Sequence, residues 1–277
     1  MPLTLMYITN DSAVALIAEK NGVDRIWVDL ETLGKEQRQK GLNSVKSHHT
    51  IEDIRVISPL LTKAEMLVRV NPINPKSKKE IDEVIAAGAD MIMLPMWKSS
   101  KEVLQFLKFV NGRVKTTLLL ETKEAVDCVD DVLSLGGFDE IHIGLNDLHL
   151  SYGLSFMFEL LSNGIVENLC SKFRQNGIPY GFGGIAKLGS GLIPAEMVIK
   201  EHYRLGSTRA ILSRSFCNID QIRDKAEIEK IFSINMKKLR AYEKEIEMCD
   251  IFDFDKNKAT MDEKIKIVSK EMGRNES

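Results

Sequence analysis

Short apolar segments rich in β-forming residues alternate along this chain with longer segments of helical periodicity. The apolar segments are Leu3–Ile8, Arg25–Asp29, Met66–Val70, Met91–Leu94, Thr116–Leu120, Glu140–Ile143, Tyr180–Phe182 and Ala210–Leu212. Most of them are apolar on both faces, which is typical of strands in a parallel sheet whose two faces are covered. The pattern therefore predicts eight buried parallel strands.

The segments between these strands repeat apolar residues at helical spacing. They are Asp11–Asn21, Thr50–Leu61, Ser77–Ala87, Ser100–Val110, Thr122–Leu135, Phe156–Gln175 and Pro194–Leu205. Strands that alternate with helices favour a (β/α)8 TIM barrel. An open doubly wound sheet that binds a dinucleotide would carry GxGxxG after its first strand, but Thr-Asn-Asp-Ser follows here. We therefore predict a barrel.

The chain continues well beyond the eighth predicted strand. Apolar residues recur there at helical spacing, at Ile228, Ile231, Phe232, Met236, Leu239, Tyr242 and Ile246. We therefore predict a barrel domain over residues 1–222 and a C-terminal helical extension over residues 223–277. The extension either packs on the barrel or forms a subunit contact, and the sequence leaves both interpretations open.

Composition narrows the class of protein. The chain has 277 residues with a net charge of −2, which gives no reason to expect nucleic acid as a partner. Its four cysteines are widely spaced and form no CxxC pair, so we expect reduced thiols in a cytosolic protein. No segment approaches the roughly 20 apolar residues of a membrane span. The sequence therefore predicts a cytoplasmic protein without a membrane partner.

Polar residues follow several of the predicted strands at the end where barrel enzymes carry their active sites. Glu31, Arg69, Glu121 and Asp147 lie at or just after the second, third, fifth and sixth strands. Carboxylates without an accompanying cysteine favour a hard divalent cation such as Mg²⁺ or Mn²⁺. The alternatives are helix caps or solvated carboxylates and, for Arg69, an ion pair with Asp29 or Glu31.

Several segments resemble the HpcH/HpaI aldolase and citrate lyase β-subunit family. They are GVDRIWVDLE, MLVRVNP, AAGADMIMLPM and LLLETKEAVDCVDDVLSLGGFDEIHIGLNDLHLSYG. The resemblance implies a divalent metal on Glu121 and Asp147, and an arginine, Arg69, that steadies an enolate oxygen. It also implies that the backbone N–H groups of Asn146 and Asp147 receive the substrate carboxylate, and that the protein is a homo-oligomer.

One departure from the family pattern leaves the catalytic base open. Pyruvate aldolases of the family have a catalytic histidine directly after the acidic residue of the second strand, whereas Thr32 follows Glu31 here. The polar loop that follows ends in His48 and His49, which are either the catalytic base or a solvent-exposed pair.

A second open point concerns the loops after strands seven and eight. Lys187 and Arg214 lie in these loops, which often bind phosphate groups in barrel enzymes. They either bind an anionic group of the aldehyde substrate or simply belong to glycine-rich turns and an ion pair.

The leading hypothesis is a metal-dependent carbon–carbon lyase. It would act on a 2-oxo acid such as pyruvate through an enolate, with an aldehyde as second substrate, Glu31 contributing to substrate binding, and the metal acting as a Lewis acid. One alternative is a CoA-ester lyase of the citrate or malyl type, because Asp29-Leu30-Glu31 resembles the Asp-Leu-Glu of those enzymes. The other is a non-catalytic barrel that only binds a metal and an oxo acid.

Overall fold

Eight strands form the centre of the molecule in a computed structural model that describes residues 1–34, 49–219 and 221–275. They are β1 (Thr4–Ile8), β2 (Arg25–Asp29), β3 (Glu65–Arg69), β4 (Met91–Leu94), β5 (Lys115–Leu120), β6 (Glu140–Ile143), β7 (Tyr180–Ile185) and β8 (Arg209–Leu212). They follow one another in sequence order as a closed barrel, and their helices alternate with them. The predicted TIM barrel is therefore confirmed.

The strands form where the sequence is apolar on both faces. All residues of β2, β4 and β6 are buried, and β2 pairs with β3 in parallel register from Arg25–Glu65 to Asp29–Arg69. Strand β7 runs three residues beyond its predicted end at Phe182, through Gly183 and Gly184 to Ile185. Glycine is a poor strand former, so the prediction stopped too early. The register of β7 against β8 shifts between Gly181 and Gly184, as in a β-bulge.

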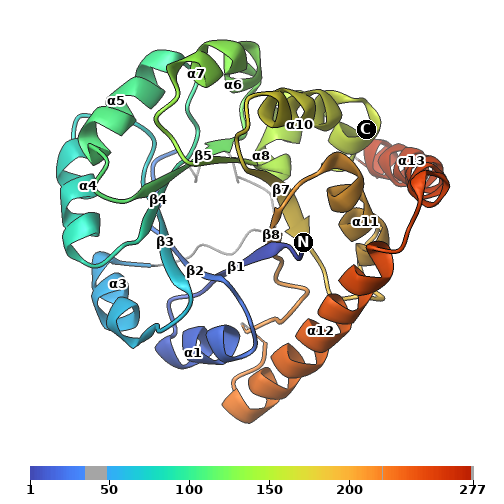
Figure 1. The fold of residues 1–277 in the computed structure, drawn as a ribbon, viewed down its shortest axis with the longest axis horizontal. Helices are drawn as coiled ribbons and strands as arrows, with labels where there is room; N and C mark the ends of the chain where they lie inside the picture. The colour runs from blue at the N-terminus through green and yellow to red at the C-terminus, as the bar shows by residue number, and fades with distance from the viewer. Residues whose placement is uncertain (35–48, 220, 276–277) are drawn as a thin grey trace. The chain divides into compact units, whose positions relative to one another are not determined.

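The chain divides into two compact units. The first, called here the N-terminal unit, is Met6–Glu140, and the second, called here the C-terminal unit, combines Met1–Leu5 with Ile141–Ser277. The N-terminal unit contains α1 (Ser12–Lys20), α3 (Ile51–Ile57), the 3₁₀ helix η1 (Ser58–Leu60), α4 (Ser77–Ala86), α5 (Ser100–Val110), α6 (Lys123–Asp127) and α7 (Val129–Leu135). In Figure 1, α1, α3, α4 and α5 lie outside strands β2 to β4 of the same unit.

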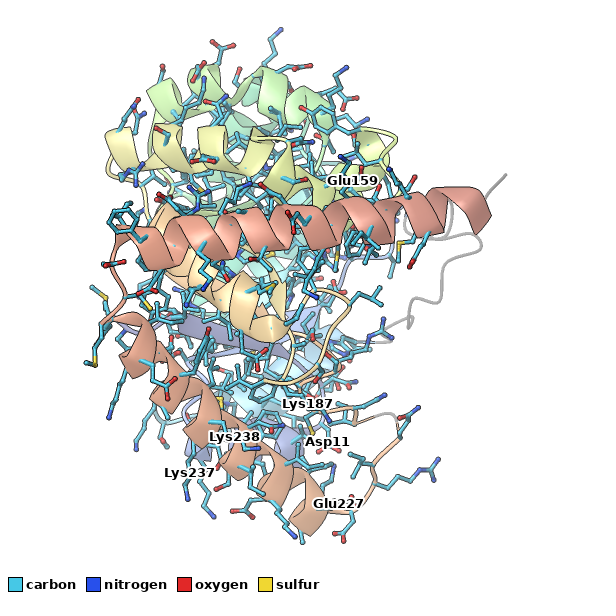
Figure 2. The ribbon with its side chains drawn as sticks, turned by 90° about the vertical axis from the view of Figure 1, so that its right-hand side faces the viewer. Asp11, Glu159, Lys187, Glu227, Lys237 and Lys238 are labelled. Atoms are coloured by element: carbon cyan, nitrogen blue, oxygen red, sulfur yellow. The ribbon has the colours of Figure 1, made fainter. Side chains whose placement is uncertain are left out.

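The C-terminal unit contains the remaining helices. They are α8 (Leu145–Ser151), α9 (Glu159–Ser162), α10 (Ile165–Gln175), α11 (Ala195–Leu205), α12 (Lys225–Ile246) and α13 (Ile251–Asn275). Helix α13 contacts α11 and α9, and Figure 2 shows it running across this unit beside Glu159. The helical extension is therefore confirmed and packs on helices of its own chain. The domain boundary at residue 222 and a role in subunit contacts stay predictions.

Three predicted helical or loop segments differ from the structure. The segment Thr122–Leu135 is not one helix, because α6 ends at Asp127 and α7 begins at Val129. The segment Phe156–Gln175 is interrupted before Ile165, where Gly164 has a φ of +86° that a continuous helix cannot contain. The Gly-Leu-Asn-Asp sequence, where no helix was predicted, begins helix α8 after Gly144.

Among the residues that the structure describes, no helix combines the length and the apolar character needed to cross a membrane. The four cysteines all lie in the described part of the chain and form no disulfide there, and Cys170 and Cys217 are buried.

Candidate functional site

An arginine and two carboxylates meet at the carboxyl ends of β2 and β3. Asp29 and Arg69 are partners in the strand register, so their side chains leave neighbouring strands at the same level. The Arg69 Nε and Nη2 atoms donate to Asp29 Oδ1 and Oδ2, both at 2.8 Å. Its Nη1 atom lies 3.4 Å from Glu31 Oε2. The two parallel hydrogen bonds to Asp29 are the strong form of an arginine–carboxylate pair, and they fix the orientation of the guanidinium plane.

The surroundings of Arg69 keep its charge in place. Its side chain is 12% exposed, and the guanidinium carbon lies 5.2 Å from the centroid of the Trp27 ring. Burial by itself would lower the pKa of Arg69. The carboxylates of Asp29, Glu31 and Glu121 outweigh burial and raise this pKa above its ordinary value. Arg69 is therefore a permanent positive charge beside three acidic side chains.

Glu121 follows β5 and is 3% exposed. Its Oε1 atom accepts a hydrogen bond from the backbone N–H of Met96 at 3.0 Å. Met96 has a φ of +52°, a left-handed conformation that a non-glycine residue adopts only at an energetic cost. The next residue, Thr122, donates from Oγ1 to the Trp97 carbonyl oxygen at 2.9 Å. The turn after β4 is therefore tied to the end of β5 through Glu121 and Thr122.

His49 lies beside the Asp29–Arg69 pair. The backbone N–H of Asp29 donates to His49 Nδ1 at 2.9 Å. An Nδ1 atom that accepts a hydrogen bond places the proton of the neutral ring on Nε2. In this arrangement the neutral His49 ring presents Nε2–H as a hydrogen-bond donor. His48, the other predicted base, lies outside the described residues.

The remaining predicted residues belong to the C-terminal unit. Asn146 is exposed and Asp147 is half-buried, and both lie in the first turn of α8. Lys187 and Arg214 are exposed. Because Ile185 pairs with Leu212, these two cations each lie two residues beyond matched positions on β7 and β8. Both cations therefore lie in the segments that directly follow two neighbouring strands.

The chemistry of the acidic residues fits a hard divalent cation. Asp29, Glu31 and Glu121 against Arg69 sum to a charge of −2 when all are ionised, and burial makes such an excess costly. Within residues 1–34, 49–219 and 221–275, no three or more His, Cys, Asp or Glu side chains are grouped as the ligands of a metal ion. The predicted ligands Glu121 and Asp147 belong to different units, and their joint role stays a prediction.

A family model described as HpcH/HpaI aldolase/citrate lyase matches residues 3–159. The chain belongs to this family. The match contains Glu31, Arg69, Glu121, Asn146 and Asp147. It ends before Lys187 and Arg214, so the family match lends these two cations no support. Family members are lyases, and membership supports a lyase.

Solved structures of the family have the same fold. An HpcH/HpaI aldolase from Desulfitobacterium hafniense DCB-2 is 15% identical, with a TM-score of 0.60 over 86% of this chain and 93% of that one. An HpcH/HpaI aldolase/citrate lyase family protein from Burkholderia cenocepacia J2315 is 14% identical, with a TM-score of 0.59 over 87% and 95% of the two chains. At this identity the likeness shows the fold alone. No curated protein matches the sequence.

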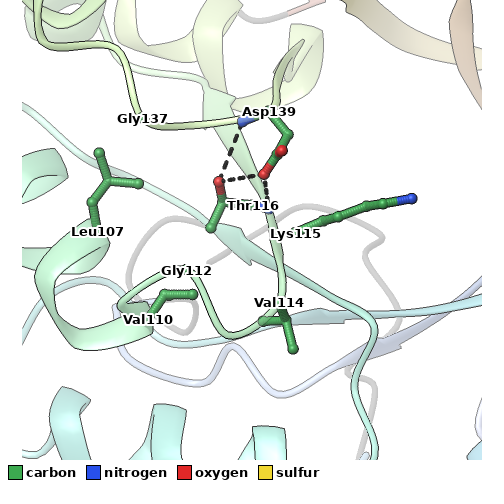
Figure 3. A pocket seen from close by; sticks show the side chains of 8 residues that line it. All are labelled: Leu107, Val110, Gly112, Val114, Lys115, Thr116, Gly137 and Asp139. Carbon is green, nitrogen blue, oxygen red and sulfur yellow. Dashed lines mark hydrogen bonds between the residues drawn. The ribbon is translucent and has the colours of Figure 1, made fainter.

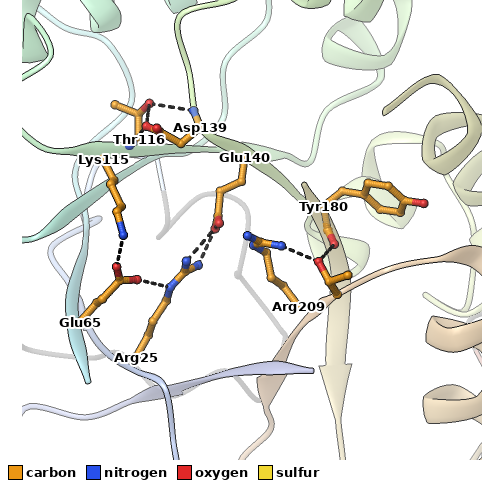
Figure 4. A network of polar contacts seen from close by, with 9 residues as sticks. Arg25, Glu65, Lys115, Thr116, Asp139, Glu140, Tyr180 and Arg209 are labelled. Carbon is orange, nitrogen blue, oxygen red and sulfur yellow. Dashed lines mark hydrogen bonds and ion pairs between the residues drawn. The ribbon is translucent and has the colours of Figure 1, made fainter. Parts of the chain in front are cut away.

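Two further polar features of the N-terminal unit lie where β5 and β6 begin rather than at the predicted site. A pocket of about 390 Å³ is lined by Leu107, Val110, Gly112, Val114, Lys115, Thr116, Gly137 and Asp139 (Figure 3). A charged network joins Arg25 to Glu140 and Glu65, and Glu65 to Lys115 (Figure 4). Neither feature contains a predicted site residue.

Sequence reasoning missed two contributors to the site. Asp29 was not predicted as a site residue, although it orients Arg69 and also binds His49 through its backbone. Asn71 was not predicted either, although its side chain contacts both residues that flank Glu31. The position of Asn71, two residues after Arg69, is the signal that would have drawn attention to it.

Proposed function

We propose that this protein is a metal-dependent carbon–carbon lyase that acts on a 2-oxo acid such as pyruvate, with an aldehyde as second substrate. The observation that carries the proposal is the largely buried Arg69, which Asp29 and Glu31 hold in one orientation. Glu121 lies close enough to raise the pKa of Arg69, and the chain belongs to the HpcH/HpaI family.

In the proposed reaction Arg69 supplies fixed positive charge. Removing a proton from the carbon next to a carbonyl group, or breaking a bond to that carbon, develops negative charge on the carbonyl oxygen. A guanidinium that is already oriented stabilises this charge without reorganising as the reaction proceeds. Arg69 meets that requirement because Asp29 holds its Nε and Nη2 atoms.

Mg²⁺ or Mn²⁺ would be held by the carboxylates of Glu121 and Asp147, whose oxygen atoms are the ligands such cations prefer. When bound, the cation supplies a Lewis acid at the carbonyl oxygen of the substrate. The backbone N–H groups of Asn146 and Asp147 lie in the first turn of α8. We assign them to the substrate carboxylate.

Two further roles complete the proposal. Glu31 contributes to substrate binding beside Arg69, and His49 or His48 is the proton-transferring base. His49 lies beside the Asp29–Arg69 pair. Lys187 and Arg214 bind an anionic group on the aldehyde. Their matched positions after β7 and β8 support this assignment.

The experiment that tests the proposal is deuterium exchange into pyruvate. The protein is incubated with pyruvate in D₂O with Mg²⁺, with Mn²⁺ or with a chelator, and the methyl signal is followed by proton NMR. We expect the signal to decrease only when protein and metal are both present. The absence of any metal-dependent exchange would show that the pyruvate assignment is wrong.

Arg69→Lys provides the residue-level test. Lysine keeps the charge but lacks the planar fork that holds Asp29, so the charge is no longer fixed at the developing oxyanion. We expect the exchange rate to fall by about 100-fold or more. Arg113→Lys is the matched control, since Arg113 pairs with the exposed Asp82 and should leave the rate unchanged. Equal rates for Arg69→Lys and the wild type would contradict the role of Arg69.

A second candidate function is supported by the Asp29-Leu30-Glu31 arrangement. Both acidic residues contact Arg69, and the sequence resembles that of CoA-ester lyases at this point. Formation of acetyl-CoA together with oxaloacetate from citryl-CoA, or together with glyoxylate from malyl-CoA, measured by liquid chromatography, would favour this candidate over an aldolase, provided that pyruvate shows no metal-dependent exchange.

A further inference from the structure

The side-chain oxygen of Asn71 anchors the segment that follows β2. Asn71 Oδ1 accepts hydrogen bonds from the backbone N–H groups of Thr32 at 2.9 Å and Leu33 at 3.0 Å. It also accepts from Thr32 Oγ1 at 3.3 Å. One amide oxygen therefore satisfies two successive backbone donors of a segment that forms no strand or helix of its own.

The other half of the amide faces acceptors. Asn71 Nδ2 donates to Glu80 Oε1 at 2.7 Å and to the Leu30 carbonyl oxygen at 3.3 Å. The Asn71 backbone N–H donates to the same Glu80 oxygen at 3.1 Å. A carbonyl oxygen can only accept and backbone N–H groups can only donate, so these partners fix which end of the amide is oxygen. Glu80 on α4 thus holds Asn71 in one orientation.

These contacts hold the backbone on both sides of Glu31. Leu30 and Thr32, the residues on either side of it, are both bonded to the Asn71 side chain, and the Glu31 N–H donates to Asp29 Oδ1 at 3.1 Å. The Glu31 backbone therefore has little freedom, although it lies in an irregular segment. Its carboxylate is 2% exposed and lies 3.4 Å from Arg69.

We propose that Asn71 is a positioning residue that sets Glu31 against Arg69, with Glu80 as its support. The inference rests on the proposed function for its catalytic consequence, whereas the anchoring itself is a property of the fold. Asn71 acts through Glu31 and has no role in contacting substrate.

The first test needs no activity. In Asn71→Ala the N–H groups of Thr32 and Leu33 lose their acceptor, so hydrogen–deuterium exchange in the peptide that contains them should become at least about tenfold faster. Asn74→Ala is the matched control, because Asn74 is also half-buried and, among the described residues, its hydrogen bonds go to Pro72, Lys76 and Ser77. It should leave exchange at Thr32 and Leu33 unchanged. Unchanged exchange in Asn71→Ala would overturn the proposal whatever the protein's activity.

The second test uses metal-dependent pyruvate exchange. A misplaced Glu31 should lower the kcat of this exchange by about tenfold or more, because displacements near 1 Å at a reacting centre are costly. Asn71→Ala, Glu31→Gln and the double variant form a cycle. If Asn71 acts through Glu31, the double variant should be no slower than Glu31→Gln alone. Additive losses, or an unchanged kcat in Asn71→Ala, would overturn the positioning role.

A pair of variants that exchanges donor and acceptor between Asn71 and Glu80 tests whether Asn71 positions Glu31 or only stabilises the fold. Asn71→Asp keeps the acceptor for Thr32 and Leu33 but turns a carboxylate oxygen toward Glu80. Adding Glu80→Gln restores a donor opposite that oxygen, so the double variant should recover slow amide exchange and most of the kcat. No recovery in amide exchange would contradict the proposed support by Glu80. If the wild type shows no pyruvate exchange, the proposed function fails, and amide exchange alone decides the anchoring.

Discussion

His202 is a fully buried base in the C-terminal unit. Its ring stacks on that of Phe182 with centroids 3.8 Å apart, and its Nδ1 atom lies 2.7 Å from Ser207 Oγ. Burial, assisted by the nearby His142, lowers the pKa of His202 from 6.5 to about 3. The folded protein therefore keeps His202 neutral under conditions in which the unfolded chain protonates it.

This difference predicts the direction of a pH effect. Between pH 6.5 and about 3 the unfolded chain binds one more proton at His202 than the folded chain, so stability falls as the pH falls. The slope can reach about 1.4 kcal/mol per pH unit. We expect the free energy of unfolding in urea to decrease more steeply from pH 7 to pH 5 in the wild type than in His202→Gln. Parallel pH profiles for the two proteins would contradict this account.

Individual residues also show what sequence could predict about the site. The ion pair of Arg69 with Asp29 and Glu31 was one of the two interpretations that the sequence left open, because all three residues lie at the carboxyl ends of adjacent strands. The roles of Asn71 and His49 could not be read in the same way. Their positions depend on how irregular segments return to the strand ends, and no periodicity governs side-chain direction there. Buried amides that bond backbone groups leave no distinctive pattern of residues.

Helix α12 is tied to the first residues of the chain by one carboxylate. Glu243, which is 3% exposed, accepts from the Leu3 N–H at 2.8 Å and from Tyr203 Oη at 3.2 Å. Arg240 on the same helix donates to it at 2.8 Å and also to the Leu3 carbonyl oxygen at 2.9 Å. Burial and the Glu243 carboxylate raise the pKa of Tyr203, which keeps the phenol protonated as a donor.

We expect Glu243→Gln to destabilise the protein by about 3 kcal/mol, because it removes the charge that compensates a partly buried arginine. The free energy of unfolding in urea measures this loss. Glu247→Gln is the comparison, since Glu247 is half exposed and pairs only with the exposed amino terminus. It should cost less than about 1 kcal/mol. Similar losses in the two variants would show that burial of Glu243 is unimportant.

The start of a helix could be predicted from the sequence where a side chain caps it. Thr50 and Asp53 form a capping box at the start of α3, where the predicted helix Thr50–Leu61 begins. Breaks within helices were not predictable, because the apolar periodicity continues from α6 into α7 although Cys128 separates them. Periodicity reports which face is buried, and two short helices that bury neighbouring faces give the same pattern as one long helix.

At the scale of the whole molecule, β2 and β3 carry charge at both ends. Arg25 begins β2 and binds Glu140 at 2.5 Å and 3.1 Å and Glu65 at 2.8 Å, whereas Asp29 ends the same strand beside Arg69. Residues at the amino ends of barrel strands generally support stability, and those at the carboxyl ends support activity. The two clusters should therefore respond differently to substitution.

Glu140→Gln tests this division. Weakening its pair with the buried Arg25 should destabilise the protein by about 3 kcal/mol in urea unfolding. Metal-dependent pyruvate exchange, measured where the variant is fully folded, should match the wild type. Glu83→Gln, which alters an exposed pair with Lys79, should change neither quantity. A large loss of exchange in folded Glu140→Gln would contradict the proposed division between the two ends.

The barrel could be predicted because the same pattern, an apolar segment that is buried on both faces, recurs along the sequence. Side chains that converge from distant segments have no such repeat. The network of Arg25, Glu65, Lys115 and Glu140 was not expected, since each residue alone reads as a polar strand start. Convergence of Glu121 and Asp147 was inferred from strand order and family resemblance, and it stays a prediction.

The bond between Glu121 and the Met96 N–H affects how a mutational dissection of the site must be interpreted. Any substitution that shortens or neutralises Glu121 changes a proposed ligand and also loosens the restraint on a left-handed backbone residue. Inactivity of such a variant would therefore have two origins. Met96→Gly supplies the missing reference, because glycine adopts this conformation without strain. Comparing Glu121 variants in the wild type and in Met96→Gly would separate the chemical role of the carboxylate from its structural role as the acceptor of the Met96 N–H.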